Sequence, residues 1–152
     1  MLIAGVTALT GLAVLLTGCG PSHKRGAESG DANEQYWYGV CLSLGINGSP
    51  KDQKQAVYWY RKAAEQGHVE AQIELGKCYE DGNGVEKDLS QMIYWYRKAA
   101  DQGHAHAQYL LGWCYKSGHG VESNIIQARY WYGKAAKQGH KTAKSDLKEL
   151  DR

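Results

Sequence analysis

Phenylalanine is absent from the sequence, and only 2 of its 152 residues are proline. The sequence also has little excess of either charge sign. Its 18 Lys and Arg residues nearly balance its 16 Asp and Glu residues, which leaves a formal net charge of +2. A protein whose main partner is a nucleic acid normally carries a larger basic excess, so we expect no nucleic-acid partner. The hydrophobic fraction of 43% and the charged fraction of 22% are typical of a globular chain rather than a disordered one.

The N-terminal apolar run is short. Residues 1–17 contain no charged side chain, and the run ends in Leu16-Thr17-Gly18-Cys19. A membrane-spanning helix needs ~20 apolar residues, whereas a shorter run followed by small residues is typical of a secretory signal. The tetrapeptide resembles the lipobox of bacterial lipoproteins, in which the cysteine receives diacylglycerol and the chain is cleaved before it.

This resemblance implies a signal peptide over residues 1–18 and a lipid anchor on Cys19. We then expect a protein anchored in the bacterial cell envelope, and Gly20, where aspartate would favour the inner membrane, points to the outer membrane and the periplasm. The alternative is a plain signal peptide with a chance cysteine, and no basic residue opens the signal before Lys24. Residues 19–31 lack large apolar side chains and predict a flexible tether.

A repeat of 36 residues fills the rest of the chain. Tyr-Trp-Tyr-Arg-Lys-Ala-Ala occurs at 58–64 and 94–100, and again at 130–136 with glycine in place of arginine. Gln-Gly-His follows each copy at constant spacing, and Leu-Gly-x-Cys-Tyr precedes the second and third copies. Residues 38–41 are a degraded version of that upstream segment. A period of about 20 to 50 residues is typical of a solenoid array.

Each repeat predicts two helices. Apolar residues at helical spacing form one face of the first helix, which in the second repeat consists of Ala71, Leu75, Cys78 and Tyr79. Glycines are expected to end the first helices, and Asp52, Asp88 and Asn124 are expected to cap the second helices. We predict an all-α fold, an α-solenoid of about three helix–turn–helix repeats (32–67, 68–103 and 104–139) within a domain over 32–152. A C-terminal capping helix in 140–152 brings the total to about seven helices.

The motifs are similar to those of the Sel-one-like repeat (SLR) family, which is related to tetratricopeptide repeats. The pattern is nearly complete from Ala71 to Gly103 and from Ala107 to Gly139, and weaker from about Asn33 to Gly67. The resemblance implies a solenoid that binds proteins or envelope components. It also implies a groove lined by the side of each first helix that faces away from the core.

The candidate partner-binding groove consists of Tyr36, Val40, Ile73, Lys77, Tyr109, Trp113 and Lys116. If this row faces solvent, it forms an exposed apolar patch of the kind that marks binding sites, and its lysines can pair with acidic groups of a protein or peptide partner. The alternative is that the aromatic side chains pack on one another or on the tether. We interpret Tyr58, Tyr94 and Tyr130 as packing residues of the second helices.

Cysteines and histidines also recur with the repeat. Cys41, Cys78 and Cys114 share one repeat position, and neighbouring helices lie about 8–10 Å apart, too far for a disulfide, so we predict buried free thiols. The resemblance includes a cysteine-rich branch with reported penicillin-binding or β-lactamase activity, but alanines such as Ala64 and Ala71 stand where that branch has paired cysteines.

We expect no metal and no cofactor. His68, His104 and His140 follow a turn glycine in every repeat and are interpreted as a repeat feature, because residues one repeat apart cannot converge on one zinc ion. A surface metal site formed by His104, His106 and His119 is the alternative.

No nucleophile–base pair is identified, so we predict a non-catalytic binding scaffold. The alternatives are a structural or self-assembling protein, an effector that contacts a host or competitor, and a hydrolase of β-lactams or peptidoglycan fragments. The oligomeric state is left open.

Overall fold

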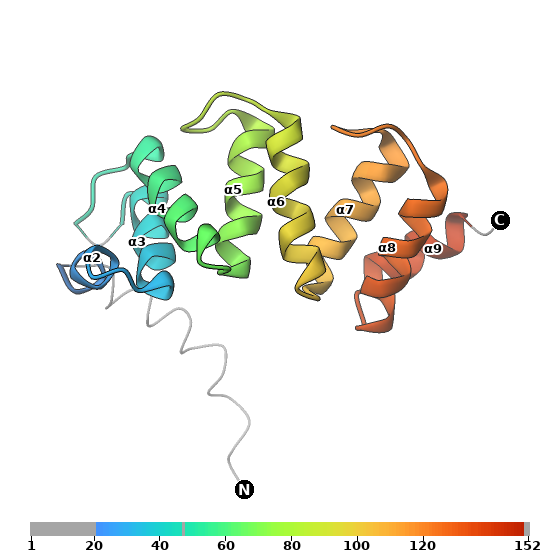
Figure 1. The fold of residues 1–152 in the computed structure, drawn as a ribbon, viewed down its shortest axis with the longest axis horizontal. Coiled ribbons are helices and arrows are strands. Elements are labelled where there is room, and N and C mark those ends of the chain that lie inside the picture. The colour runs from blue at the N-terminus through green and yellow to red at the C-terminus, as the bar shows by residue number, and fades with distance from the viewer. Residues whose placement is uncertain (1–20, 47, 151–152) are drawn as a thin grey trace, which may run out of the picture. The chain divides into compact units, whose positions relative to one another are not determined.

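The computed structural model describes residues 21–46 and 48–150, and every regular element in these residues is an α-helix (Figure 1). The helices are α2 (Pro21–Glu28), α3 (Ala32–Leu44), α4 (Gln53–Glu65), α5 (Val69–Asp81), α6 (Leu89–Asp101), α7 (Ala105–Ser117), α8 (Ile125–Lys137) and α9 (Lys141–Leu150). The predicted signal peptide and the predicted lipid anchor on Cys19 lie outside the described residues. None of the helices above is long and apolar enough to cross a membrane.

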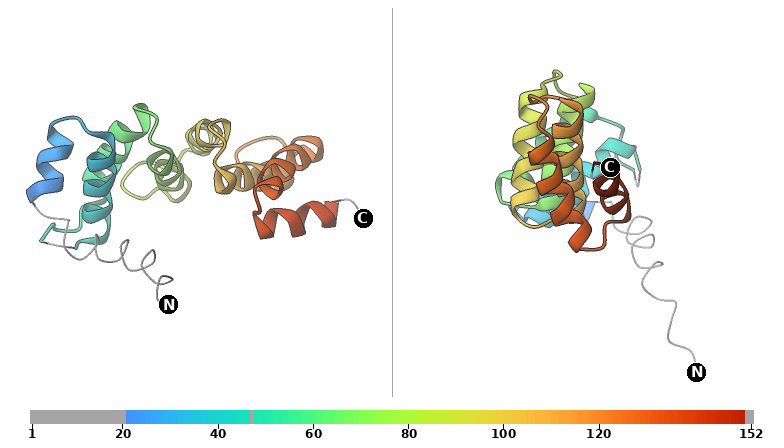
Figure 2. Two further views of the ribbon diagram at one scale, coloured as in Figure 1. Left: turned by 90° about the horizontal axis from the view of Figure 1, so that it is seen from below. Right: turned by 90° about the vertical axis from the view of Figure 1, so that its right-hand side faces the viewer.

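The helices belong to two compact units. Helices α2, α3 and α4 lie in the first unit, which ends at His68, and α5 to α9 lie in the second, which begins at Val69. Helix α3 pairs with α4, α5 with α6, and α7 with α8. In the second unit α9 packs against α8 (Figure 2).

The helix ends confirm the sequence prediction. Each second helix begins with a side-chain cap. The side-chain oxygen of the cap accepts a 3.0 Å hydrogen bond from the backbone N–H of the residue three positions later, and the caps are Asp52, Asp88 and Asn124. These bonds satisfy an amide that has no partner inside its own helix. Gly45 and Gly118 end α3 and α7 in the left-handed conformation that glycine adopts without a steric penalty.

Inside each helix pair, a tyrosine ring of the second helix lies against a glycine of the first. A Cβ atom on Gly76 of α5 would lie 2.5 Å from Tyr96 Cε1, and one on Gly112 of α7 would lie 2.6 Å from Tyr132 Cδ1. Tyr96 is 1% exposed and Tyr132 is fully buried. Since no real Cβ fits at such distances, the two helices can approach this closely only where the first has glycine.

Pairs of glutamines connect successive helices. Gln108 of α7 is 3% exposed, and its Nε2 donates to Ala100 O at 3.2 Å. Its Oε1 accepts from Gln138 Nε2 at 2.8 Å, and the same Nε2 also donates to Gly103 O at 2.8 Å. Gln35 bonds to Ala27 and Gln66 in the same way in the first unit. The buried amide groups are thus hydrogen-bonded, which is the condition for burying them at little cost.

The flexible tether predicted over residues 19–31 is wrong for most of its length. Residues 21–28 form α2, which packs on α3 and buries Ala27 to 1% exposure. His23 also bonds to Glu34 of α3. The described residues therefore contain eight helices rather than about seven.

Helix α2 resembles the end of the second helix of a repeat. Lys24-Arg25-Gly26-Ala27-Glu28 matches Arg61-Lys62-Ala63-Ala64-Glu65 of α4. Gly30 follows with φ 98°, as Gly67 follows α4 with φ 91°. Gln35 then bonds to Ala27 O as Gln108 bonds to Ala100 O, which fixes the repeat register.

We predict that Gln108→Leu lowers the free energy of unfolding by about 1–3 kcal/mol, because it removes the Gln108 side-chain bond to the carbonyl of the buried Ala100 and the bond to the exposed Gln138 amide. Urea unfolding followed by circular dichroism measures the change. The matched control is Gln55→Leu, an exposed site on α4, for which we expect a change within about 0.5 kcal/mol. Equal effects at the two positions would contradict the structural role of the glutamine pair.

Candidate functional site

In the first unit, the predicted groove residues are largely engaged by the protein itself. The Tyr36 ring stacks on His68 with centroids 4.7 Å apart and lies 6.0 Å from the Tyr60 ring. Val40 is half-buried. The packing alternative therefore describes Tyr36 better than the binding alternative.

In the second unit, the predicted row separates into buried and exposed residues. Ile73 is 4% exposed, so its placement in a solvent-facing groove is wrong. Tyr109 is half-buried, because its ring stacks on His140 with centroids 4.6 Å apart and on Tyr132 at 5.7 Å. Each helix side opposite the core is partly covered by the next repeat, which a single-helix wheel does not include.

The two lysines of the row form ion pairs within the protein. Lys77 Nζ lies 2.8 Å from Glu74 Oε1 on the same helix. Lys116 Nζ lies 3.2 Å from Glu149 Oε2 of α9. Both pairs are partly solvent-exposed, so each contributes little to stability. A partner with acidic groups would have to compete with Glu74 and Glu149.

Trp113 of α7 is the aromatic residue of the predicted groove that remains accessible to solvent, with 38% of its surface exposed. Its ring centroid lies 5.2 Å from that of His119. The Nε2 atom of His119 is 3.2 Å from Glu80 Oε1, and Glu80 Oε2 accepts a 2.9 Å hydrogen bond from Tyr96. An indole surrounded by polar groups that hold fixed positions is typical of a protein-binding hot spot.

The interpretation of Tyr58, Tyr94 and Tyr130 as packing residues is wrong. These side chains are 47%, 48% and 51% exposed. Each ring lies edge-on to the following tryptophan, and the ammonium of the lysine four residues later lies over it, at 5.4, 5.5 and 4.7 Å from the centroid. Every second helix of a repeat thus presents a tyrosine–lysine pair to solvent.

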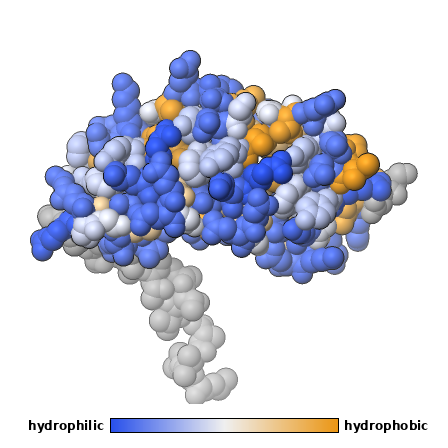
Figure 3. All heavy atoms as spheres, in the orientation of Figure 1, coloured by the Kyte–Doolittle hydropathy of each residue, from blue (hydrophilic) through white to orange (hydrophobic). Residues whose placement is uncertain are grey.

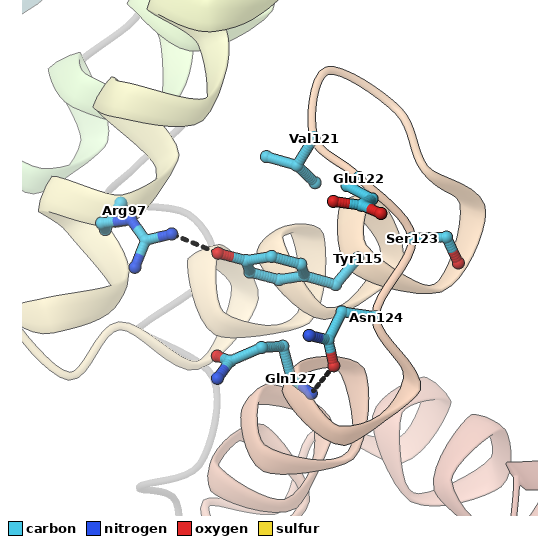
Figure 4. A pocket seen from close by; sticks show the side chains of 7 residues that line it. All are labelled: Arg97, Tyr115, Val121, Glu122, Ser123, Asn124 and Gln127. Atoms are coloured by element: carbon cyan, nitrogen blue, oxygen red, sulfur yellow. Dashed lines mark hydrogen bonds between the residues drawn. The ribbon is translucent and has the colours of Figure 1, made fainter.

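An open polar depression lies between α6, α7 and the start of α8 (Figure 4). It is lined by Arg97, Tyr115, Val121, Glu122, Ser123, Asn124 and Gln127. The Arg97 guanidinium donates to the Tyr115 hydroxyl, which joins α6 to α7. Asn124 is the N-cap of α8 and accepts from the Gln127 backbone. The Arg97–Tyr115 bond therefore links two repeats, whereas the Asn124 bond stabilises the start of α8.

Two of the repeat cysteines are buried thiols, as predicted. Cys78 is 8% exposed and Cys114 is fully buried. Burial raises the pKa of the Cys78 thiol to about 11 and that of Cys114 to about 12, and nearby carboxylates add to both shifts. Both thiols are thus protonated at neutral pH and poor nucleophiles. The prediction of a free thiol is wrong for Cys41, which is disulfide-bonded.

Two of the three repeat histidines cap helices. His104 Nδ1 accepts from Ala107 N at 3.4 Å, and His140 Nδ1 accepts from Ala143 N at 3.2 Å. Burial lowers the pKa of the neighbouring His106, and positive charge on Lys77 lowers it further. Within residues 21–46 and 48–150 no three His, Cys, Asp or Glu side chains are grouped to hold a metal ion.

The sequence contains one Ser-x-x-Lys spacing, although no nucleophile–base pair was predicted from it. Ser145 and Lys148 stand three residues apart in α9. Serine β-lactamases use this spacing for the nucleophile and a nearby lysine. Here both side chains are exposed on the capping helix, outside any pocket described above.

A family model described as the Sel1 repeat matches the chain three times, at residues 35–68, 69–104 and 105–140. The chain belongs to the Sel1 repeat family. The all-α solenoid predicted from the sequence is thereby confirmed, and the Sel1 fold is suited to a protein-interaction scaffold.

Solved structures of Sel1 repeat proteins are similar to this chain. One from Oxalobacter formigenes is 39% identical with a TM-score of 0.77, and the match covers 84% of this chain and 96% of that one. A protective antigen of uropathogenic Escherichia coli strains, which displays an SLR fold, is 43% identical with a TM-score of 0.74, over 77% of this chain. This chain spans 25% of that antigen's length.

Helicobacter pylori cysteine rich protein B is also similar, with 30% identity, a TM-score of 0.63 and coverage of 77% of this chain and 95% of that one. No curated protein matches the chain significantly.

Proposed function

We propose that the protein is an exported, lipid-anchored scaffold that binds a protein partner in the bacterial envelope, without catalysis, through the surface around Trp113. The apolar run of residues 1–17 and the Leu-Thr-Gly-Cys tetrapeptide support export and acylation of Cys19. The anchor reaches the membrane, and several acyl chains hold a protein there durably.

Such an anchor would hold the repeat array close to the lipid. Helix α2 begins at Pro21, only two residues after Cys19, and two residues span at most ~7 Å. The partner would then be an envelope component at the membrane surface, within reach of the repeats.

The exposure of Trp113 carries the proposal for binding. Large aromatic side chains dominate the energetics of protein interfaces, and Trp113 retains 38% exposure on a helix whose neighbouring row residues are packed or ion-paired. The polar groups around it, His119 and Glu80, can pair with a partner at the rim.

The chemistry of the other reactive groups favours binding over catalysis. The described free thiols are buried and protonated, and His104 and His140 are engaged as helix caps. Ser145 and Lys148 lie exposed on α9, where no enclosed site desolvates a substrate.

We predict that the wild-type protein incorporates radiolabelled palmitate in its bacterial host and that Cys19→Ala does not. Absence of label on the wild type would overturn the lipoprotein proposal.

The binding surface is tested by chemical cross-linking in intact envelopes. We predict that Trp113→Ala loses a cross-linked partner that the wild type captures. Truncation of a central aromatic anchor typically costs about 2 kcal/mol or more, roughly thirtyfold in affinity.

Leu44→Ala is the matched control, because Leu44 is a large exposed residue (58%) of the first unit. It should retain the partner, and all three proteins should keep the same thermal unfolding curve. Retention of the partner by a folded Trp113→Ala protein would show that the surface lies elsewhere.

A second candidate function is contact with a host. The similarity to the protective antigen of uropathogenic Escherichia coli is the observation that favours it. Accessibility of the protein to antibodies on intact cells separates this role from a periplasmic one.

A further inference from the structure

We propose that the outer face of α6 and α8 is a second docking surface, which binds an acidic segment of a protein partner. This face is defined by Tyr94, Lys98, Ile126, Tyr130, Lys134 and Lys137. The proposal rests on the scaffold role but not on Trp113, which belongs to α7.

Charge is divided unequally between the helices of the second unit. Helices α6 and α8 carry five basic residues, Arg97, Lys98, Arg129, Lys134 and Lys137, and a single acidic one, Asp101. Helix α5 carries four acidic residues and one basic one. The small net charge of the whole chain therefore conceals a basic surface on α6 and α8, which is complementary to an acidic partner.

The lysines of this face lack acidic partners within the described part of the protein. Lys98, Lys134 and Lys137 are exposed, and none lies within ion-pair distance of a described carboxylate. In contrast, Lys77 and Lys116 on α5 and α7 are both paired. An incoming carboxylate would thus meet ammonium groups that have no competing carboxylate among the described residues.

The tyrosines are held in fixed positions beside these lysines. Tyr94 lies edge-on to Trp95 with centroids 4.9 Å apart, and Tyr130 lies edge-on to Trp131 at 5.0 Å. The two tryptophans are buried, at 6% and 4% exposure. Their fixed rings limit the movement of the tyrosine rings that contact them edge-on. Prior fixation of an interface side chain reduces the entropy lost on binding.

The exposed side chain of Ile126 favours a protein segment over a purely ionic ligand as the occupant of this face. It is 80% exposed and lies one helical turn before Tyr130, so it extends the same ridge. The equivalent positions of α4 and α6 hold Lys54 and Ser90. An apolar side chain next to a tyrosine–lysine pair suits a peptide segment that combines carboxylates with an apolar anchor.

The test uses the full-length protein purified in detergent and two labelled peptides of the same length. The first alternates glutamate with serine around a single leucine, and in the second every glutamate is glutamine. Fluorescence anisotropy measures binding. We expect the glutamate peptide to bind at least about tenfold more tightly than the glutamine peptide. We also expect the Lys98→Glu/Lys134→Glu protein to bind the glutamate peptide at least about tenfold more weakly than the wild type does.

The matched control is Lys87→Glu/Lys144→Glu, which changes the net charge equally at exposed lysines outside this face. It should retain affinity within about threefold. Equal losses in the two double variants would overturn the proposal, as would absence of binding. Displacement of the peptide from the wild type by phosphatidylglycerol added to the micelles, but not by an equal amount of phosphatidylcholine, would assign the face to lipid and also overturn it. The Trp113→Ala variant should bind the peptide normally, so this proposal and that for Trp113 fail independently.

Discussion

The contact between a buried tyrosine and a glycine in each helix pair is the constraint on which the rest of the repeat depends. Tyr96 against Gly76 and Tyr132 against Gly112 set how closely the two helices approach. That spacing fixes which residues of the second helix face inward. Because neighbouring residues are 100° apart, burial of Tyr96 and Trp95 turns Tyr94 outward. The same contact therefore creates both the core and the exposed tyrosine face.

The repeats, the helix ends and most of the core could be predicted from the sequence, because each depends on local residues. Asp88 caps α6 and Gly118 ends α7 through bonds within a few residues. The exposed faces depend on contacts between repeats, which a helical wheel omits, and this is why Ile73 was expected to be exposed. The opposite error was made for Tyr94, which was predicted to be a packing residue because it is aromatic but is exposed. Helix α2 was missed although its residues match α4, because the lack of large apolar side chains in residues 19–31 was taken to indicate a flexible tether.

The two helix classes of a repeat carry different surface chemistry in the second unit. On α5 and α7 both lysines are ion-paired, and Trp113 is the exposed aromatic residue of these two helices. On α6 and α8 none of the lysines forms an ion pair with a described carboxylate, and Lys98 and Lys134 lie over tyrosine rings. The view of the described residues in Figure 3 is mainly hydrophilic with separate apolar patches, as expected for a protein that presents small binding surfaces. Such a scaffold can hold two partners on two faces.

The measurement that tests this account most directly is the stability of Gly112→Ala, Tyr132→Leu and the double variant. Helix propensity alone predicts that Gly112→Ala stabilises the protein by about 1 kcal/mol. The account predicts the opposite sign, a loss of about 1–3 kcal/mol, because the new Cβ overlaps the Tyr132 ring. It also predicts that the loss disappears when Tyr132 is already leucine. A stabilising Gly112→Ala, or a loss that is the same in both backgrounds, would contradict it.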